Sequence, residues 1–300
     1  MKIICSSCGE RITDKWVKIT ANNLYYHHRC FLTKNNILCS RCRKPIQEEM
    51  IISNGLPLHG ECCGIGYSIT CNICQKEITG TYSVDYWGNC FHTEHSKEYP
   101  KCEYCGRIIS KSMTKGSKKY DDGRDICSIC LALTINTINA RSIQQCYEIV
   151  SNIFGYYGIT LDKNIPIKLS NKQELKDLQQ KRKSNDVLGL ASGDEVYILT
   201  GMPIVLFIKV LAHELMHVWT YRNCPNIKDM NSRLCEGTAN LASYLTLIQI
   251  KDNYAKLFID SLMNDPDKIY GDGFRLALQR YKRAGMKKYL QMLKQYNDFY

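Results

Sequence analysis

The sequence predicts an α+β protein in which small zinc-binding modules with short β-hairpins precede a mainly helical domain with a small β-sheet. Three observations support this fold class. Cysteine and histidine pairs recur through the first 131 of the 300 residues. Apolar residues then recur at helical spacing. One apolar helix in this second part contains the pattern H-E-x-x-H. The 44% of apolar and 23% of charged residues exclude a mostly disordered chain.

Twelve of the 17 cysteines belong to four sets of predicted zinc ligands. Two cysteines that are two residues apart favour zinc, because a tight turn brings both thiolates to one tetrahedral ion. An odd number of cysteines argues against a disulfide framework. In each set, a C-x-x-C pair and a second pair of Cys or His residues with the same spacing are separated by an insert of hairpin size. The sets are Cys5, Cys8, His27 and Cys30; Cys39, Cys42, His59 and Cys62; Cys71, Cys74, His92 and His95; and Cys102, Cys105, Cys127 and Cys130.

Three other residues lie close to these ligands in the sequence. His28 and Cys63 directly follow predicted ligands, and we interpret both as unligated. Cys90 has the same interpretation, although it could replace His92 or His95 in the third set.

Charge and hydropathy exclude two classes of partner. The formal net charge is +11, and counting the thiolates and ions of the four zinc sets lowers it to about +7. Because the zinc-binding part is then nearly neutral, we expect no nucleic-acid partner. No run of 18 apolar residues is present, so we expect no membrane span. The start MKIICSSCGE lacks the apolar stretch of a secretory signal, which favours a cytoplasmic location.

Several elements are predicted in the second part. Apolar spacing predicts a helix over residues 131–154. IPIKL and EVYIL, at residues 165–169 and 195–199, are typical of short strands. Residues 204–222 are almost entirely apolar and predict a buried helix, with Pro203 suited to its start. Further helices are predicted at residues 234–250 and 286–296.

The H-E-x-x-H pattern lies in the buried helix. His213 and His217 are four residues apart, so both imidazoles can reach one ion from the same helix face. Glu214 lies about 100° round the helix, where it can contact a water on that ion. Glu236 in the next helix is the expected third ligand. The sequence therefore predicts one catalytic zinc ion in addition to the four structural ones.

Three residues near this site have weaker interpretations. Asn240, four residues after Glu236, would accept a hydrogen bond from a ligand histidine, with simple helix packing as the alternative. Cys235 adjoins Glu236, and we expect its side chain to point elsewhere on the helix. Cys224 is interpreted as a surface or packing cysteine.

The first part resembles the LIM domain, in which two zinc half-sites pack end to end. The resemblance rests on HHRCF, CSRCRKPI, CFHTEH and CEYCGRII. It implies LIM-like modules at residues 1–66 and 67–131 and a separate domain at residues 132–300. The half-sites are separated by FLTKNNIL in the first module and by six residues in the second, which predicts unusual packing angles.

The second part resembles zinc peptidases of the gluzincin type, which belong to the zincins. The segments ILTGMPIVLFIKVLAHELMHVWTYRN, LCEGTANLASYL and DPDKIYGDGF resemble the plant LIM-containing peptidases that restrict organ growth, the DA-one family. The resemblance implies a zinc-dependent endopeptidase in which His213, His217 and Glu236 hold zinc and Glu214 is the base. It also implies that the LIM-like modules recognise protein substrates or partners, or regulate cleavage. Plant members have ubiquitin-interacting motifs before the LIM region, and none precedes Cys5 here, so ubiquitin is not an expected partner.

The expected reaction is hydrolysis of a peptide bond. Glu214 would take a proton from a zinc-bound water and pass it to the leaving amine. Tyr270 or Arg275 would donate a hydrogen bond to the carbonyl oxygen. The alternative for Tyr270, Gly271 and Gly273 is a structural turn. Residues 194–200 are expected to be an edge strand that pairs with the substrate.

A competing hypothesis is a LIM-type interaction scaffold whose peptidase domain is weakly active or inactive. The complete H-E-x-x-H pattern with its downstream glutamate favours the enzyme.

Overall fold

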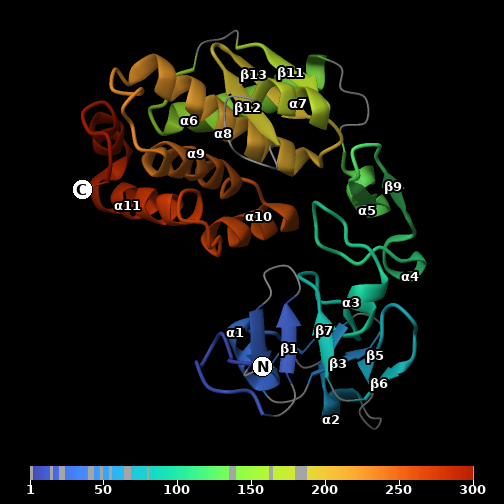
Figure 1. The fold of residues 1–300 in the computed structure, drawn as a ribbon. Coiled ribbons are helices and arrows are strands. Elements are labelled where there is room, and N and C mark those ends of the chain that lie inside the picture. Colours follow the sequence, from blue (N-terminus) through green and yellow to red (C-terminus); the bar gives the residue numbers. More distant parts are fainter. Residues whose placement is uncertain are drawn as a thin grey trace. The chain divides into compact units, whose positions relative to one another are not determined.

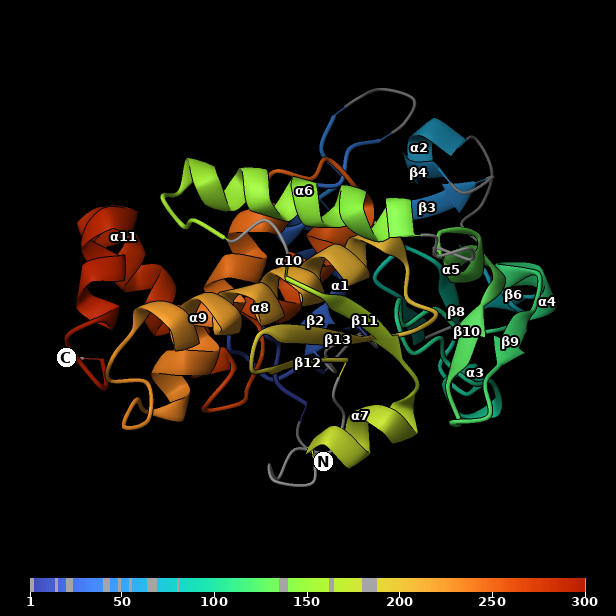
Figure 2. The same ribbon diagram turned by 90° about the horizontal axis from the view of Figure 1, so that it is seen from above.

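The computed structural model consists of two compact units, Met1–Ile129 and Cys130–Tyr300, and each is described by itself. Its elements are drawn in Figure 1 and, from above, in Figure 2. The structure describes residues 3–13, 16–19, 24–39, 44–47, 50–53, 56–63, 69–79, 81–134, 140–161, 165–179 and 188–299.

β-Hairpins followed by short helices make up most of the first unit. Each hairpin coincides with the insert between the two ligand pairs of one predicted set. The hairpins and their helices are β1 (Trp16–Ile19), β2 (Leu24–His27) and α1 (His28–Lys34); β3 (Met50–Ser53), β4 (Leu56–His59) and α2 (Gly60–Cys63); β7 (Tyr82–Val84), β8 (Cys90–His92) and α3 (His95–Glu98); and β9 (Ser117–Lys119), β10 (Asp125–Cys127) and α5 (Ser128–Ala132). The shorter β5 (Ile69–Thr70), β6 (Glu77–Ile78) and α4 (Lys111–Thr114) lie between them in the sequence.

One sheet of the first unit joins hairpins that are far apart in the sequence. Its strand order is β2-β1-β7-β8, and β1 and β7 pair in parallel, with Val17 opposite Tyr82. Val17, Leu32 and Phe91 are fully buried in the core that forms beside this sheet. The first and third ligand sets are therefore attached to the same sheet.

The sheet of the second unit has the order β11-β13-β12, with β11 (Ile167–Ser170), β12 (Gly189–Ser192) and β13 (Glu195–Leu199). The structure confirms the strands predicted at residues 165–169 and 195–199, with a shift at the first. The prediction that residues 194–200 form an edge strand is wrong. β13 pairs in parallel with β11 and antiparallel with β12, so β12 is an outer strand of the described sheet.

Helices form the rest of the second unit. They are α6 (Ala140–Tyr156), α7 (Lys172–Gln179), α8 (Ile204–Asn223), α9 (Ser232–Leu247), α10 (Asn253–Met263) and α11 (Gly271–Leu293). The helix predicted at residues 131–154 is thus two helices, α5 and α6, and residues 135–139 between them lie outside the described residues. The helix predicted at residues 286–296 is the last part of α11.

α8 is the core helix of the second unit. It contacts α6, α9 and α10 and the strands β12 and β13 (Figures 1 and 2). Because it is apolar on all sides, it can be buried on all sides, and Leu211, Leu215 and Val218 have no exposed surface. Among the described residues, α8 is also long and apolar enough to cross a membrane, but 78% of that apolar window is already buried by protein.

α9 and α11 approach each other at two glycines. A Cβ atom on Gly237 would lie 2.3 Å from the carbonyl carbon and oxygen of Gly273. A Cβ atom on Gly273 would lie 2.4 Å from the carbonyl oxygen of Arg233. Gly271 and Gly273 lie in the first turn of α11, where the absence of a side chain on Gly273 permits the contact with α9 and its absence on Gly271 permits close approach of Asp265.

Candidate functional site

Side chains of the predicted ligand sets converge in the structure. The candidate ligand atoms within each group lie no more than 4.8 Å apart. Cys42 lies outside the described residues, so the second set is described by its other three members. The groups are Cys5, Cys8, His27 and Cys30; Cys39, His59 and Cys62; Cys71, Cys74, His92 and His95; and Cys102, Cys105, Cys127 and Cys130.

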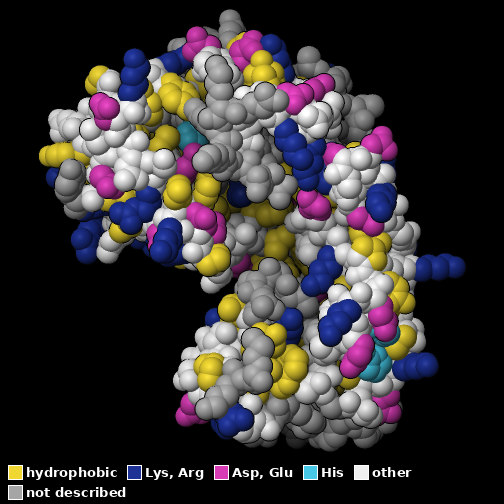
Figure 3. Space-filling view, viewed as in Figure 1, with side chains coloured by type: hydrophobic (Ala, Val, Ile, Leu, Met, Phe, Trp, Pro, Cys, Tyr) yellow, Lys and Arg dark blue, Asp and Glu magenta, His cyan; other side chains and the backbone are white. Residues whose placement is uncertain are grey.

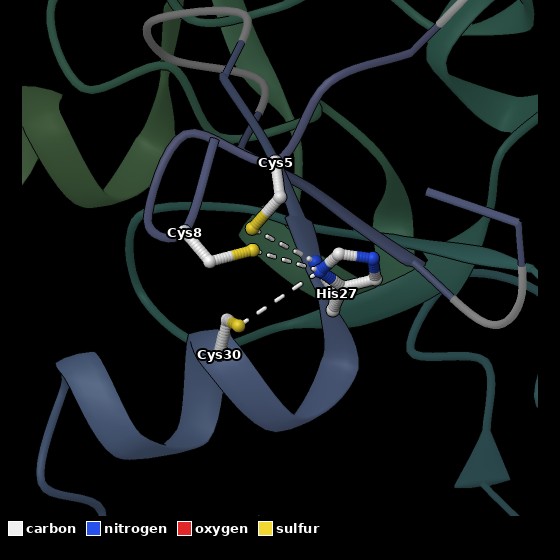
Figure 4. A group of neighbouring side chains, drawn as sticks. All are labelled: Cys5, Cys8, His27 and Cys30. Atoms are coloured by element: carbon white, nitrogen blue, oxygen red, sulfur yellow. Dashed lines mark hydrogen bonds between the residues drawn. The ribbon is translucent and has the colours of Figure 1, made fainter. Parts of the chain in front are cut away.

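In the first group, the sulfur atoms of Cys8 and Cys30 face the His27 ring, and the backbone N–H of His27 donates to the sulfur of Cys5 (Figure 4). Nδ1 of His27 lies 3.4 Å from Cys8 Sγ and 3.8 Å from Cys30 Sγ. The other ring nitrogen, Nε2, lies 3.3 Å from the carbonyl oxygen of Arg11 and donates to it. A neutral imidazole that donates from Nε2 has its lone pair on Nδ1. Nδ1 is therefore the ligand atom, and it faces the thiols as a zinc site requires.

The same arrangement recurs at the next two hairpins. His59 Nε2 lies 3.0 Å from the Pro45 carbonyl oxygen, and His92 Nε2 lies 3.2 Å from that of Glu77. Their Nδ1 atoms face Cys62 and Cys74, at 3.9 Å and 3.4 Å. In each case a backbone carbonyl orients the ring, as is usual for zinc-bound histidine.

His95 in the third group uses the opposite nitrogen. Its Nδ1 lies 2.5 Å from Glu98 Oε2. Its Nε2 is buried and has no hydrogen-bond partner among the described residues. A buried nitrogen without a partner is costly, and a metal ion held with Cys71, Cys74 and His92 would satisfy it. These groups thus fit zinc by their donor chemistry.

Three of the turns that carry cysteine pairs, those that begin at Cys5, Cys71 and Cys102, share a left-handed residue, and the turn after Cys39 lies outside the described residues. The backbone N–H of Gly9, Gln75 and Gly106 donates over 2.9 Å to the carbonyl oxygen of the first cysteine of its pair. The φ angles are +75°, +62° and +69°. Glycine adopts this conformation freely, whereas a side chain there is strained. Gln75 is the residue with such a side chain.

Cys90 and His28 have surroundings of their own, outside these groups. Cys90 is buried, and its thiol donates to the Gly88 carbonyl oxygen over 3.8 Å. Burial, with smaller effects from Asp85 and Cys71, raises the pKa of the Cys90 thiol to about 12. The His28 ring packs edge-on to Tyr82, with the ring centres 5.9 Å apart. The side chain of Cys63 lies outside the described residues.

A fifth group lies between α8 and α9 in the second unit. His213 Nε2 and His217 Nε2 are 3.1 Å apart, and each lies 3.2 Å from Glu236 Oε2. The helices are antiparallel, because residues later in α8 contact residues earlier in α9. This direction places the downstream glutamate opposite both histidines.

The outer nitrogens of these two histidines also have partners. His213 Nδ1 lies 3.0 Å from Asn240 Oδ1, and His217 Nδ1 lies 3.5 Å from Cys235 Sγ. The expectation that Cys235 points elsewhere is therefore wrong, because the ring of His217 reaches both Glu236 and the residue directly before it. If both Nδ1 atoms donate, the two Nε2 lone pairs face each other and a carboxylate. The two lone pairs and the carboxylate repel one another unless a cation lies among the three atoms. This group therefore also fits a metal ion.

Electrostatics favour an ionised ligand carboxylate. Burial alone would raise the pKa of Glu236, but when His213 and His217 are protonated, their hydrogen bonds and charge outweigh burial and lower this pKa well below its usual range. Glu236 is therefore ionised, as a metal ligand must be.

Glu214 lies on the side of α8 that faces β12. It is buried, with 6% of its surface exposed. A Cβ atom on Gly189, the first residue of β12, would lie 3.0 Å from Glu214 Oε1 and 2.6 Å from a Val210 methyl group. Gly189 was not predicted as a site residue. The available signal was a glycine at the start of a strand, which often marks a close approach of the backbone.

Tyr270 and Arg275 have different surroundings. The Asn240 side-chain amide donates to the Tyr270 carbonyl oxygen over 3.2 Å, so Tyr270 is joined to His213 through one side chain. The Arg275 guanidinium donates to the carbonyl oxygens of Met263 and Asp265 and pairs with Asp272 at 2.5 Å. These bonds hold it at the connection between α10 and α11.

Comparison with known proteins gives two results. The LIM domain family matches residues 5–62, which contain the first two ligand sets, and LIM domains mediate protein–protein interactions. Over nearly its whole length, the chain is homologous to DA1 and DA1-related plant proteins.

Three relatives illustrate these matches. The LIM domain-containing protein HDR3 of Oryza sativa subsp. japonica is 23% identical, over 97% of this chain and 72% of its own. Protein DA1 of Arabidopsis thaliana is 21% identical, over 99% of this chain and 68% of its own length. The lipoma-preferred partner homolog of Gallus gallus is 28% identical, over 35% of this chain and 21% of its own.

Proposed function

We propose that the chain is a zinc-dependent endopeptidase whose active site is formed by α8 and α9. The observation that carries the proposal is the convergence of His213 Nε2, His217 Nε2 and Glu236 Oε2 at 3.1–3.2 Å, beside the buried carboxylate of Glu214. Three protein ligands leave a coordination position open, which is typical of catalytic rather than structural zinc. Homology to the DA1-related proteins over nearly the whole chain adds support.

The proposed chemistry divides the work among this chain's residues. Zinc, when bound, supplies a Lewis acid that polarises the peptide carbonyl and acidifies water. Glu214 accepts the proton of the attacking water and returns it to the leaving amine. Tyr270 is the proposed hydrogen-bond donor to the carbonyl oxygen. Arg275 is proposed to hold the segment that carries Tyr270, because it binds the Asp265 carbonyl oxygen before that residue and the Asp272 carboxylate after it.

We further propose that β12 pairs with the extended substrate. It is an outer strand, and its first residue, Gly189, contacts Glu214. A peptide can add to such an edge through backbone hydrogen bonds. A cavity of about 370 Å³ lies beside this strand, lined by Leu178, Leu190 and Tyr221 among others. The Tyr221 ring stacks at 6.4 Å from that of His217, so an apolar substrate side chain would enter this cavity close to the metal.

Replacing the proposed base tests this function. Glu214→Gln should lower kcat by about 10²–10⁴-fold while the zinc content stays unchanged, because the amide cannot accept the proton. Cleavage of an unfolded protein and of a peptide mixture, read by mass spectrometry, measures the effect. Glu148→Gln, at an exposed glutamate of α6, is the matched control. Cleavage by Glu214→Gln at the wild-type rate would exclude the mechanism.

A protein-interaction scaffold is the second candidate. It is supported by the LIM match at residues 5–62 and by the likeness of about a third of the chain to the lipoma-preferred partner homolog. On the face drawn in Figure 3, Lys and Arg side chains alternate with Asp and Glu, which suits a protein partner better than a nucleic acid. Partner capture by a wild-type chain that holds its zinc and cleaves no substrate would favour this candidate.

We propose a cytoplasmic location for either function. Thiol ligands such as those of Cys71 and Cys74 must stay reduced to bind zinc, and the cytoplasm keeps thiols reduced.

A further inference from the structure

We propose that Cys235 is a positioning residue of the metal group, whose sulfur accepts the Nδ1–H of His217 and fixes the ring that presents Nε2 to zinc. The inference rests on the catalytic zinc of the proposed function. It assigns a role to a cysteine that lies outside every ligand set.

The geometry follows from the two nitrogens of one ring. His217 Nε2 faces Glu236 Oε2 at 3.2 Å, and Nδ1 faces Cys235 Sγ at 3.5 Å. An imidazole that binds metal through Nε2 carries its proton on Nδ1. The sulfur must then be the acceptor, since a protonated Nδ1 has no lone pair to accept the thiol proton. Two consecutive residues of α9 thus hold opposite sides of one ring.

Helix packing explains how consecutive residues can do this. Along the α8–α9 contact, the Ser243 hydroxyl donates to the Lys209 carbonyl oxygen and Asn240 meets His213. One further turn along α8, His217 lies level with Cys235 and Glu236 and is 5% exposed. The ring therefore fills the space between the helices, with a neighbour at each nitrogen.

The two histidines differ in the strength of their outer partners. Asn240 accepts with an amide oxygen and is itself fixed by donating to the Tyr270 carbonyl oxygen. Cys235 accepts with sulfur, which is larger and a weaker acceptor. Orientation of His217 thus depends on one partly exposed thiol, and the metal affinity should depend on that thiol as well.

Two substitutions separate the acceptor from its volume. Cys235→Ala and Cys235→Ser leave side chains of similar size, but serine retains an acceptor. We expect Cys235→Ala to lower the zinc affinity of this group by about 10–100-fold, the usual effect of losing an outer hydrogen bond. Cys235→Ser should recover most of that loss. Cys146→Ala removes a buried thiol of α6 that belongs to no ligand group, and its zinc affinity should match the wild type.

The measurement is zinc release from the full chain to a competing chelator, counted as ions per chain. His217→Ala identifies which ion belongs to this group, because that ion should be missing from it. Cobalt in place of zinc gives a second readout, since its visible absorption reports ligand geometry. Equal affinities for the wild type and Cys235→Ala would overturn the proposal. An equal loss in Cys235→Ala and Cys235→Ser would also overturn it, because packing would then be the cause.

This result can be told apart from failure of the proposed function. A wild-type chain that binds the ion but cleaves no peptide would refute the endopeptidase and leave the affinity comparison valid. A wild-type chain that binds no ion at His213, His217 and Glu236 would refute both.

Discussion

The metal groups at the cysteine pairs and the group on α8 and α9 differ in how their histidines are oriented. At the hairpins, His27, His59 and His92 each donate to a backbone carbonyl oxygen. His95, which begins α3 in the third group, is the exception, because its Nδ1 faces the Glu98 carboxylate. On α8, His213 and His217 donate to side chains. A backbone acceptor persists through most substitutions, whereas a side-chain acceptor can be changed by a single one. The first kind of group is suited to hold a fold, and the second to be adjusted for chemistry.

The largest expected effect tests whether the groups at the cysteine pairs hold the fold, as the comparison requires. Cys74→Ala removes a ligand of the third group, and structural zinc sites contribute about 10–16 kcal/mol of binding and folding free energy. We expect the variant to lose one zinc ion per chain and the fold of that hairpin, as measured by metal analysis and limited proteolysis.

Cys90→Ala is the matched control for Cys74→Ala. Its thiol is buried in the same module but contacts the Gly88 carbonyl oxygen rather than the ligand group. We expect a loss of about 1 kcal/mol in the free energy of unfolding and no loss of zinc. Loss of an ion from Cys90→Ala would assign a ligand role to Cys90 in place of His92 or His95.

A second effect should be confined to the group on α8 and α9. Tyr270→Phe removes the proposed donor to the carbonyl oxygen, and loss of one such donor costs about 10²–10³ in kcat. Steady-state cleavage rates should show this fall with little change in KM, and zinc counting should show no loss. An unchanged kcat would exclude the proposed donor role of Tyr270.

The smallest effect concerns the turns of the cysteine pairs. Gln75 has φ +62° where Gly9 and Gly106 occupy the equivalent positions. Gln75→Gly should relieve left-handed strain and raise the free energy of unfolding by about 0.5–1 kcal/mol, after the entropic cost of glycine. Thermal unfolding of the zinc-loaded chain measures this. A lower midpoint for the variant would mean that the glutamine side chain stabilises the turn by more than its strain costs.

Local features were predictable from the sequence, and contacts between distant segments were not. Ligand spacing, as in Cys71 and Cys74, and the apolar helix of His213 each depend on residues close in the sequence. The parallel pairing of β1 with β7 leaves no local pattern, because strands of four and three residues meet across more than 50 intervening positions.

The same limit applied at the site. The central strand β13 (EVYIL) is more apolar than β11 (IKLS) and β12 (GLAS). It was mistaken for an edge because no strand was predicted at β12, its second neighbour in the sheet. Cys235 was missed because helical periodicity alone places consecutive side chains on different faces. It does not reveal that the ring of His217 is wide enough to contact two of them.

The glycine contact between α9 and α11 has a consequence for the choice of metal. Glu236 is next to Gly237, whose backbone lies against Gly273 with no side chain to yield. The distance between the ligand carboxylate and α8 therefore has little freedom to expand. Larger ions that need six to eight oxygen ligands, such as calcium, would require the helices to separate. The spacing of two backbones thus favours a small ion with few ligands before any ligand chemistry is considered.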